Sequence, residues 1–132
     1  MQSLQAFKKE ERLSRKKIIE SLFLQGKSFS KYPVKVVWLD YHLEGRYPAQ
    51  VLISVPKRKF KRAVDRNLLK RRMREAYRKN KELLYEFLRE NGKSCVLALL
   101  YVSNEIASYN EIEEKIILAL ERCKSEYEKT AK

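Results

Sequence analysis

The feature that most constrains this chain is the basic segment from Lys57 to Lys81. It holds thirteen of the thirty lysines and arginines but only two acids, so it carries +11 of the formal net charge of +13. Neither Gly nor Pro interrupts residues 63–81, and Leu69, Met73 and Tyr77 recur at helical spacing. The segment therefore predicts a helix with one apolar side that packs on the protein.

The other side of this predicted helix presents a ladder of polar and cationic side chains. At about 3.6 residues per turn, one face collects Asn67, Lys70, Arg71, Arg74, Arg78 and Lys81. A solvated face is the usual explanation, but such a face alternates charge signs, and this one offers almost no acidic partners. Repulsion between crowded cations destabilises the free protein, and a bound phosphate backbone would offset this cost. The ladder therefore predicts a surface for a polyanion, most commonly nucleic acid.

Length and composition indicate a single domain over residues 1–132. The chain is 44% apolar, enough for one modest core, and its polar residues 1–12 suit a flexible N-terminal extension. No apolar run approaches the roughly 20 residues of a membrane helix, and the N-terminus lacks a signal peptide's apolar segment, so we expect a cytoplasmic protein. Cys95 and Cys123 fit neither a metal site nor a disulfide framework and are expected in the core.

Hydrophobic periodicity predicts the remaining elements. A helix capped by Ser14 and ended by Gly26 precedes strands at 29–31, 34–40 and 49–55, with a hairpin turn at 42–48. The basic helix continues through residues 82–89, and a buried apolar strand follows at 95–102. A capping box of Ser108 and Glu111 starts the last helix.

The residues offer little for catalysis by the protein itself. The single histidine, His42, lies in the predicted turn without a partner pattern and is expected to be a solvated loop residue. There is no Ser/His/Asp or Cys/His constellation, no glycine-rich phosphate loop and no acid cluster for two metal ions. We therefore expect no catalytic residue and no metal ligand in this chain.

The basic segment resembles the protein subunit of bacterial ribonuclease P. The resemblance rests on Lys57-Arg58, Ala63-Val64, Arg66-Asn67, Lys70-Arg71 and Arg74-Glu75, in the order and spacing of the family's signature. Two positions depart from that signature. The Lys61-Arg62 pair replaces the usual glycine, and Leu68 replaces the last residue of an Arg-Asn-Arg triplet.

The resemblance implies an α+β fold with the element order αβββαβα. This is a two-layer sandwich with a sheet of about four strands and a left-handed βαβ crossover around the basic helix. General principles alone favour the right-handed crossover that nearly all such connections adopt. The handedness is therefore a point on which the family and the general rule disagree.

The resemblance also implies a function, which is to assist the endonucleolytic removal of the 5′ leader from precursor tRNA. The catalyst would be the RNA subunit, which would also hold the magnesium cofactor, and no membrane or DNA partner is expected. The expected RNA-binding residues are Lys57, Arg58, Arg62, Arg66, Asn67, Lys70, Arg71, Arg74 and Arg78. A cleft for the leader is expected at Ile19, Phe23, Lys35 and Val37, although spacing alone favours Phe23 as a core residue.

Two other functions stay open. A structural RNA-binding protein of ribosomal type fits the basic helix equally well, but it does not predict the ordered Arg-Asn spacing. A DNA-binding regulator would place the basic helix in a major groove. Such a helix usually follows a short turn and a supporting helix, whereas an apolar strand and Pro56 precede this one.

Overall fold

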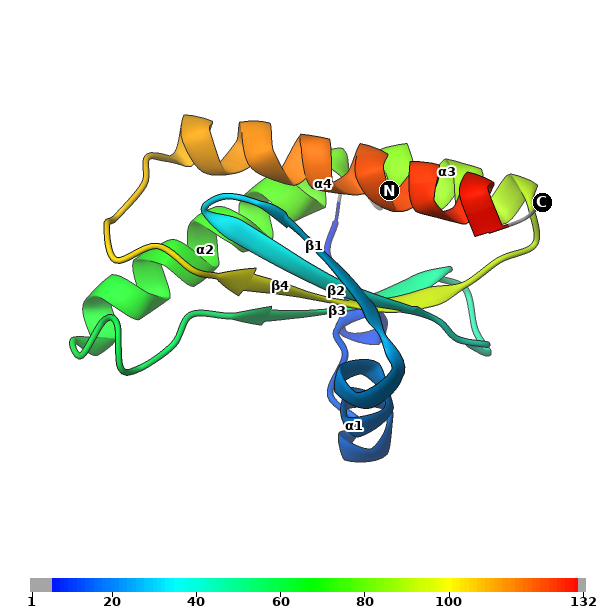
Figure 1. Cartoon of the computed structure of the whole chain (residues 1–132), viewed down its shortest axis with the longest axis horizontal. Coiled ribbons are helices and arrows are strands. Elements are labelled where there is room, and N and C mark those ends of the chain that lie inside the picture. Colours follow the sequence, from blue (N-terminus) through cyan, green and yellow to red (C-terminus); the bar gives the residue numbers. More distant parts are fainter. Residues whose placement is uncertain (1–5, 131–132) are drawn as a thin grey trace.

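The computed structural model describes residues 6–130, and within them four strands form one sheet (Figure 1). The strands are β1 (Lys27–Lys31), β2 (Val34–Asp40), β3 (Ala49–Ser54) and β4 (Cys95–Tyr101), in the spatial order β1-β2-β4-β3. β2 pairs antiparallel with β1 and with β4, while β3 pairs parallel with β4. The predicted α+β class and the number of strands are confirmed.

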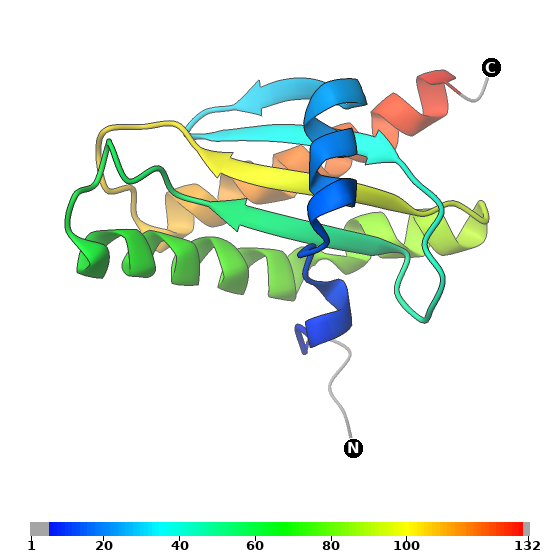
Figure 2. The same ribbon diagram turned by 90° about the horizontal axis from the view of Figure 1, so that it is seen from below.

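Helices lie on both sides of this sheet (Figures 1 and 2). On one side are α2 (Ala63–Asn80), α3 (Glu82–Glu90) and α4 (Tyr109–Thr130), which form the second layer of the sandwich. On the other side, α1 (Lys16–Gln25) crosses the strands after the short 3-10 helix η1 (Lys9–Glu11). None of the helices in residues 6–130 is long and apolar enough to span a membrane.

The position of β4 shows that the predicted hairpin at residues 42–48 is wrong. Gly45 does take the positive φ (124°) of a turn residue, but β4 lies between β2 and β3 in the sheet. Residues 95–99 of β4 are fully buried on both faces of the sheet. A strand that is apolar throughout gains most from a central position, because only there is it covered on both faces.

The connection from β3 through α2 and α3 to β4 is left-handed. Figure 2 shows the sheet from its α1 side, with α2 and α3 behind it and with β3 and β4 pointing the same way. When both strands are turned to point upward, β4 lies to the right of β3 and the connection passes behind them. Nearly all such connections have the opposite, right-handed sense. The left-handed crossover that the family resemblance implies is therefore confirmed, and the right-handed crossover that the general rule favours is wrong.

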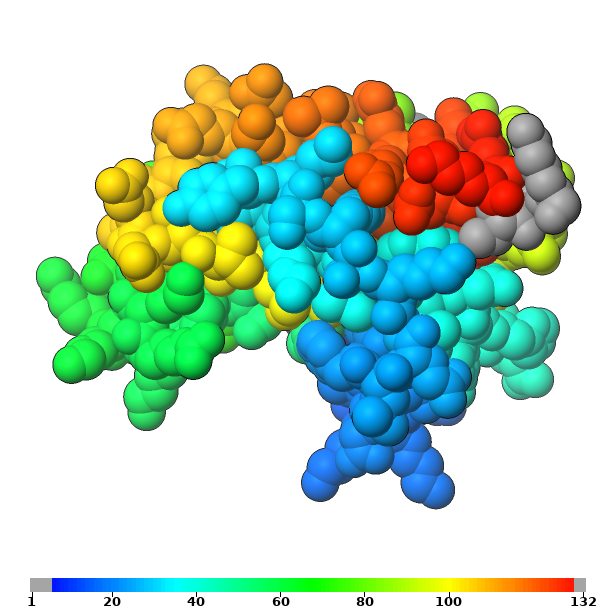
Figure 3. Space-filling model, in the orientation of Figure 1, coloured from blue at the N-terminus to red at the C-terminus, as the bar shows by residue number. Residues whose placement is uncertain are grey.

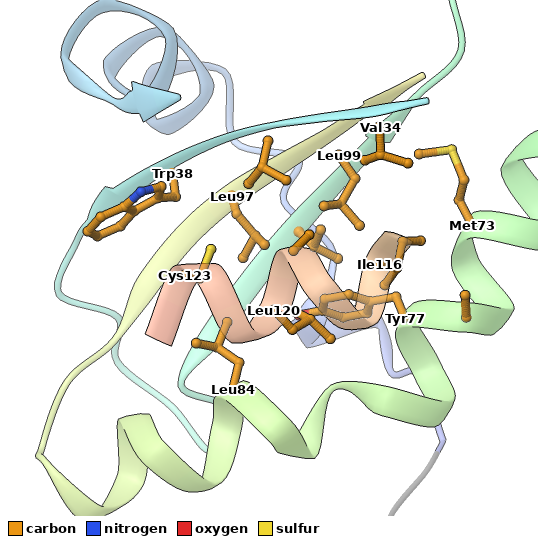
Figure 4. Close-up of a cluster of buried hydrophobic side chains, with 14 of the residues drawn as sticks. Val34, Trp38, Met73, Tyr77, Leu84, Leu97, Leu99, Ile116, Leu120 and Cys123 are labelled. Carbon is orange, nitrogen blue, oxygen red and sulfur yellow. The ribbon is translucent and has the colours of Figure 1, made fainter. Parts of the chain in front are cut away.

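Two apolar clusters join the layers. The larger cluster lies between the sheet and the helices α2 to α4; Figure 4 shows Val34, Trp38, Leu97 and Leu99 facing Met73, Tyr77, Leu84, Ile116, Leu120 and Cys123. Both cysteines are free and buried, as predicted. The smaller cluster lies under α1 and consists of Leu13, Ile18, Leu22, Val37, Val96 and Ala98. Burial of apolar area in these clusters is the main stabilising term of the fold.

The predicted helix ends are confirmed at two places and wrong at a third. The Oγ of Ser108 accepts a hydrogen bond from the Glu111 backbone N–H at 3.2 Å, as expected of a cap for α4. Gly26 ends α1 as predicted. The predicted Ser14 cap is wrong, because α1 begins at Lys16 and no described side chain caps it.

Candidate nucleic-acid interface

One flank of α2 presents cations to solvent. Asn67, Arg71 and Arg74 are exposed and Lys70 is half-buried, while the opposite flank of the helix is fully buried. We call these four residues the basic stripe. Within residues 6–130, no acid pairs with a cation of the stripe. The stripe is therefore an uncompensated positive surface on a rigid helix.

Arg66, which was predicted to bind RNA, holds the loop that leads into α2. Its Nη1 donates to the backbone oxygen of Phe60 at 2.7 Å and to that of Lys61 at 2.9 Å. The second bond holds the backbone of Lys61, one of the two residues that replace the family's glycine. At least one nitrogen of Arg66 is therefore committed to the protein's own fold.

The same loop is anchored to the end of β4. The Nζ of Lys59 donates to the backbone oxygen of Val102 at 2.8 Å. The ring of Phe60 is 6% exposed and packs against Tyr101, with 5.8 Å between ring centroids. With its backbone held in this way, the loop exposes three predicted RNA contacts, Lys57, Arg58 and Arg62.

Arg78 pairs with an acid of its own helix. Its Nη2 lies 2.6 Å from Oε1 of Glu75 and its Nε lies 3.0 Å from Oε2, which is a bidentate arrangement. This hydrogen bonding lowers the pKa of Glu75 and raises the pKa of Arg78. The three-residue spacing of Glu75 and Arg78 was the sequence signal for this ion pair. Because its guanidinium is already paired, Arg78 is a weaker candidate for binding RNA than the residues of the basic stripe.

Helical periodicity placed Lys81 among the exposed cations, and this prediction is wrong. Lys81 is 1% exposed, and its Nζ donates to Oε1 of Glu11 at 2.6 Å. α2 ends at Asn80 and α3 begins at Glu82, so the expected continuous helix is interrupted where Lys81 turns inward. Local periodicity could not show this, because the partner lies 70 residues away in the chain.

The four residues predicted to form the leader cleft differ in exposure. Val37 is 7% exposed and packs under α1, and Ile19 is half-buried at the edge of the same cluster. Lys35 is exposed, and Phe23 is 48% exposed. The alternative that Phe23 is a core residue is therefore wrong.

Residues 55–62, which lead from β3 into α2, form what we call the basic loop. A notch separates α1 from the basic loop on the side of the sheet where α1 lies (Figure 3). Ile18 and Leu22 are the buried residues of α1, so the turn of the helix directs Ile19 and Phe23 to its flank on the notch side. Lys35 lies beside Leu100, which also pairs with the last residue of β3, so Lys35 is at the end of the sheet where the basic loop begins. Three of the predicted cleft residues therefore border the notch, while Val37 supports α1 from below.

His42 is exposed in its loop, as predicted. No group of three or more His, Cys, Asp or Glu within residues 6–130 could hold a metal ion. Burial raises the pKa of Cys95 to about 12 and also raises that of Cys123, so neither thiol is activated.

The chain is similar to known proteins over most of its length. The model of the ribonuclease P family matches residues 7–124. The ribonuclease P protein component of Porphyromonas gingivalis strain ATCC 33277 is 39% identical over 117 residues, which is 86% of this chain and 83% of the relative. That of Chlorobium phaeobacteroides is 36% identical over 105 residues, covering 74% of this chain and 72% of the relative.

Solved structures show the same fold. The RNase P protein from Thermotoga maritima superimposes with a TM-score of 0.67 at 24% identity, covering 85% of this chain and 96% of that one. The Staphylococcus aureus RNase P protein gives a TM-score of 0.68 at 17% identity, covering 86% and 94%. By the extent of these matches, this chain belongs to the ribonuclease P protein family.

Proposed function

We propose that this chain is the protein subunit of a ribonuclease P that removes the 5′ leader from precursor tRNA in the cytoplasm. Family membership supports an RNA partner within a ribonucleoprotein. The observation that carries the proposal is the basic stripe, a row of cations on a rigid helix that no acid of residues 6–130 neutralises. Such a row favours binding of a polyanion, because the bound polyanion removes the repulsion between the cations and releases its own counterions.

The catalytic RNA would bind the stripe and the basic loop. The planar guanidinium of Arg71 or Arg74 can grip a phosphate with two hydrogen bonds, while Lys70 acts as a point charge. Asn67 adds a neutral amide that can orient a phosphate. Because Arg66 already holds the loop backbone, part of its contribution is to present the loop's exposed cations.

The single-stranded leader would lie in the notch. Phe23 offers an exposed ring on which a base can stack, and Ile19 extends that apolar flank. Lys35 supplies a positive charge on the floor of the notch, and Val37 keeps α1 in place. Only one of the two helix positions is aromatic, so stacking contributes less than a pair of rings would.

The metal chemistry would come from magnesium that the RNA subunit holds. The described residues do not fit a magnesium site of their own, because their acids are not grouped. The chain's part is then to neutralise phosphates and to position the substrate.

Reconstitution with the catalytic RNA tests the proposal. The protein should stimulate cleavage of a precursor tRNA at low magnesium, and an Arg71→Gln/Arg74→Gln variant should lose most of this stimulation. A matched control is Lys93→Gln/Lys124→Gln, which removes the same charge from exposed positions outside the stripe and the loop. Absence of stimulation by the unaltered protein would refute the proposal, as would equal losses in the two variants.

The leader site has a separate test. Phe23→Ala should weaken binding of a precursor with a leader by about tenfold, because one stacked base contributes on the order of 1–3 kcal/mol. Binding of mature tRNA, which has no leader, should not change. Equal effects on both RNAs would exclude the notch as the leader site.

A further inference from the structure

A hollow opens at the edge of the sheet, between η1, β3 and α2. It is lined by Phe7, Arg12, Leu13, Ser14, residues 51–53 and Arg74. Figure 2 shows the η1 segment beside β3 and α2. Arg12 and Arg74, which are far apart in the sequence, thus border one concave surface. Arg74 belongs to the basic stripe, whereas Arg12 lies outside the basic segment.

Arg12 is held in place before any ligand binds. The backbone N–H of Leu13 donates to the backbone oxygen of Val51 at 2.9 Å, and Arg12 itself forms a bridge with Val51. The guanidinium of Arg12 lies 5.4 Å from the centroid of the Phe7 ring, and that ring packs edge-on against Tyr77 at 5.8 Å. The backbone of Arg12 therefore has little conformational freedom to lose on binding, and the Phe7 ring restricts its exposed side chain.

The acid next to Arg12 does not neutralise it. Glu11 is fully buried and is paired with Lys81, so its charge is compensated inside the protein. In the described part of the chain, neither Arg12 nor Arg74 forms an ion pair. Two unpaired guanidinium groups on one hollow repel each other, and a bound anion removes that repulsion.

We infer that Arg12 and Arg74 bind a single backbone phosphate of RNA in this hollow, with the Ser14 hydroxyl as an additional donor. This inference rests on the proposed function, because it identifies RNA as the source of the phosphate. The site extends the basic stripe across the edge of β3 to the first turn of α1, where Arg15 and residues 16–17 are exposed. It joins the surface for the catalytic RNA to the helix that borders the notch.

The protein alone is tested with inorganic phosphate. The side-chain Nε–Hε signals of Arg12 and Arg74 in NMR spectra should shift together and report one dissociation constant. Arg46, an exposed loop residue, provides the reference for nonspecific effects. In an Arg12→Gln variant, the affinity reported by Arg74 should fall at least about threefold. If the signals of Arg12 and Arg74 shifted no more than those of Arg46, the proposed phosphate site would be refuted.

A double-mutant cycle tests the site with RNA. Arg12→Gln and Arg74→Gln should each weaken binding of the catalytic RNA by about tenfold, and the double variant should lose well under the hundredfold product, because both residues hold one phosphate. Lys9→Gln is the control, since Lys9 is exposed on η1 and does not line the hollow. Thermal unfolding of each variant separates a loss of contact from a loss of fold.

The results separate this inference from the proposed function. Fully multiplicative losses, or an Arg12→Gln effect no larger than that of Lys9→Gln, would overturn the shared phosphate site. If the unaltered protein failed to bind the catalytic RNA, the proposed function would fall, and the inference that RNA supplies the phosphate would fall with it. The titration with inorganic phosphate would still decide whether the hollow binds an anion.

Discussion

Replacement of Lys81 by Met tests how η1, which contains Glu11, is held against the rest of the protein. Methionine keeps the length and apolar stem of lysine but removes the ammonium that lies 2.6 Å from Oε1 of Glu11. Glu11 would keep the hydrogen bond from the Tyr85 hydroxyl at 2.8 Å and that from the Lys8 N–H at 2.7 Å. Its buried charge would then have no counter-ion.

The size of the effect follows from burial. Both side chains of the pair are at most 2% exposed, and breaking a buried pair from one side costs about 3–5 kcal/mol. At roughly 3–5 °C per kcal/mol for a domain of this size, the unfolding midpoint should fall by about 10–20 °C. A Glu11→Gln/Lys81→Met double variant removes both charges and should stay within about 1.5 kcal/mol of the unaltered protein.

The assay is urea and thermal unfolding followed by far-ultraviolet circular dichroism. The expected order of stability is unaltered protein, then the double variant slightly lower, then Lys81→Met far lower. The reasoning is refuted if Lys81→Met loses less than about 1 kcal/mol, or if the double variant is as unstable as the single one. Either result would mean that the pair is solvated or that it does not hold the segment.

Three further predictions concern single positions. Gly26→Ala should cost about 1–3 kcal/mol in the same assay, because a Cβ there would lie 2.3 Å from a backbone oxygen of α1. At pH 8, far below the raised pKa values of Cys95 and Cys123, neither thiol should react with iodoacetamide until the protein is unfolded by urea. Glu75→Gln should remove the ion pair of Arg78 with its own helix and steepen the salt dependence of RNA binding, measured by filter binding, whereas an unchanged slope would keep Arg78 outside the interface.

Much of the fold was predictable from local patterns. The capping of α4 by Ser108 and the apolar strand β4 both follow from spacing that a few neighbouring residues define. The candidate interface was predictable in part, because the exposed flank of α2 follows from the same periodicity. Arg66 was named as a candidate, but its bonds to the loop backbone were not foreseen.

The sequence by itself determined which residues share a face, where the positive charge is concentrated and which family the chain resembles. Tertiary structure alone decided that β4 separates β2 from β3, that Lys81 turns inward to Glu11 and that Arg12 borders a hollow with Arg74. The reason is physical: side-chain direction within a helix or strand depends on near neighbours, whereas these three features depend on contacts between segments that only the folded chain brings together.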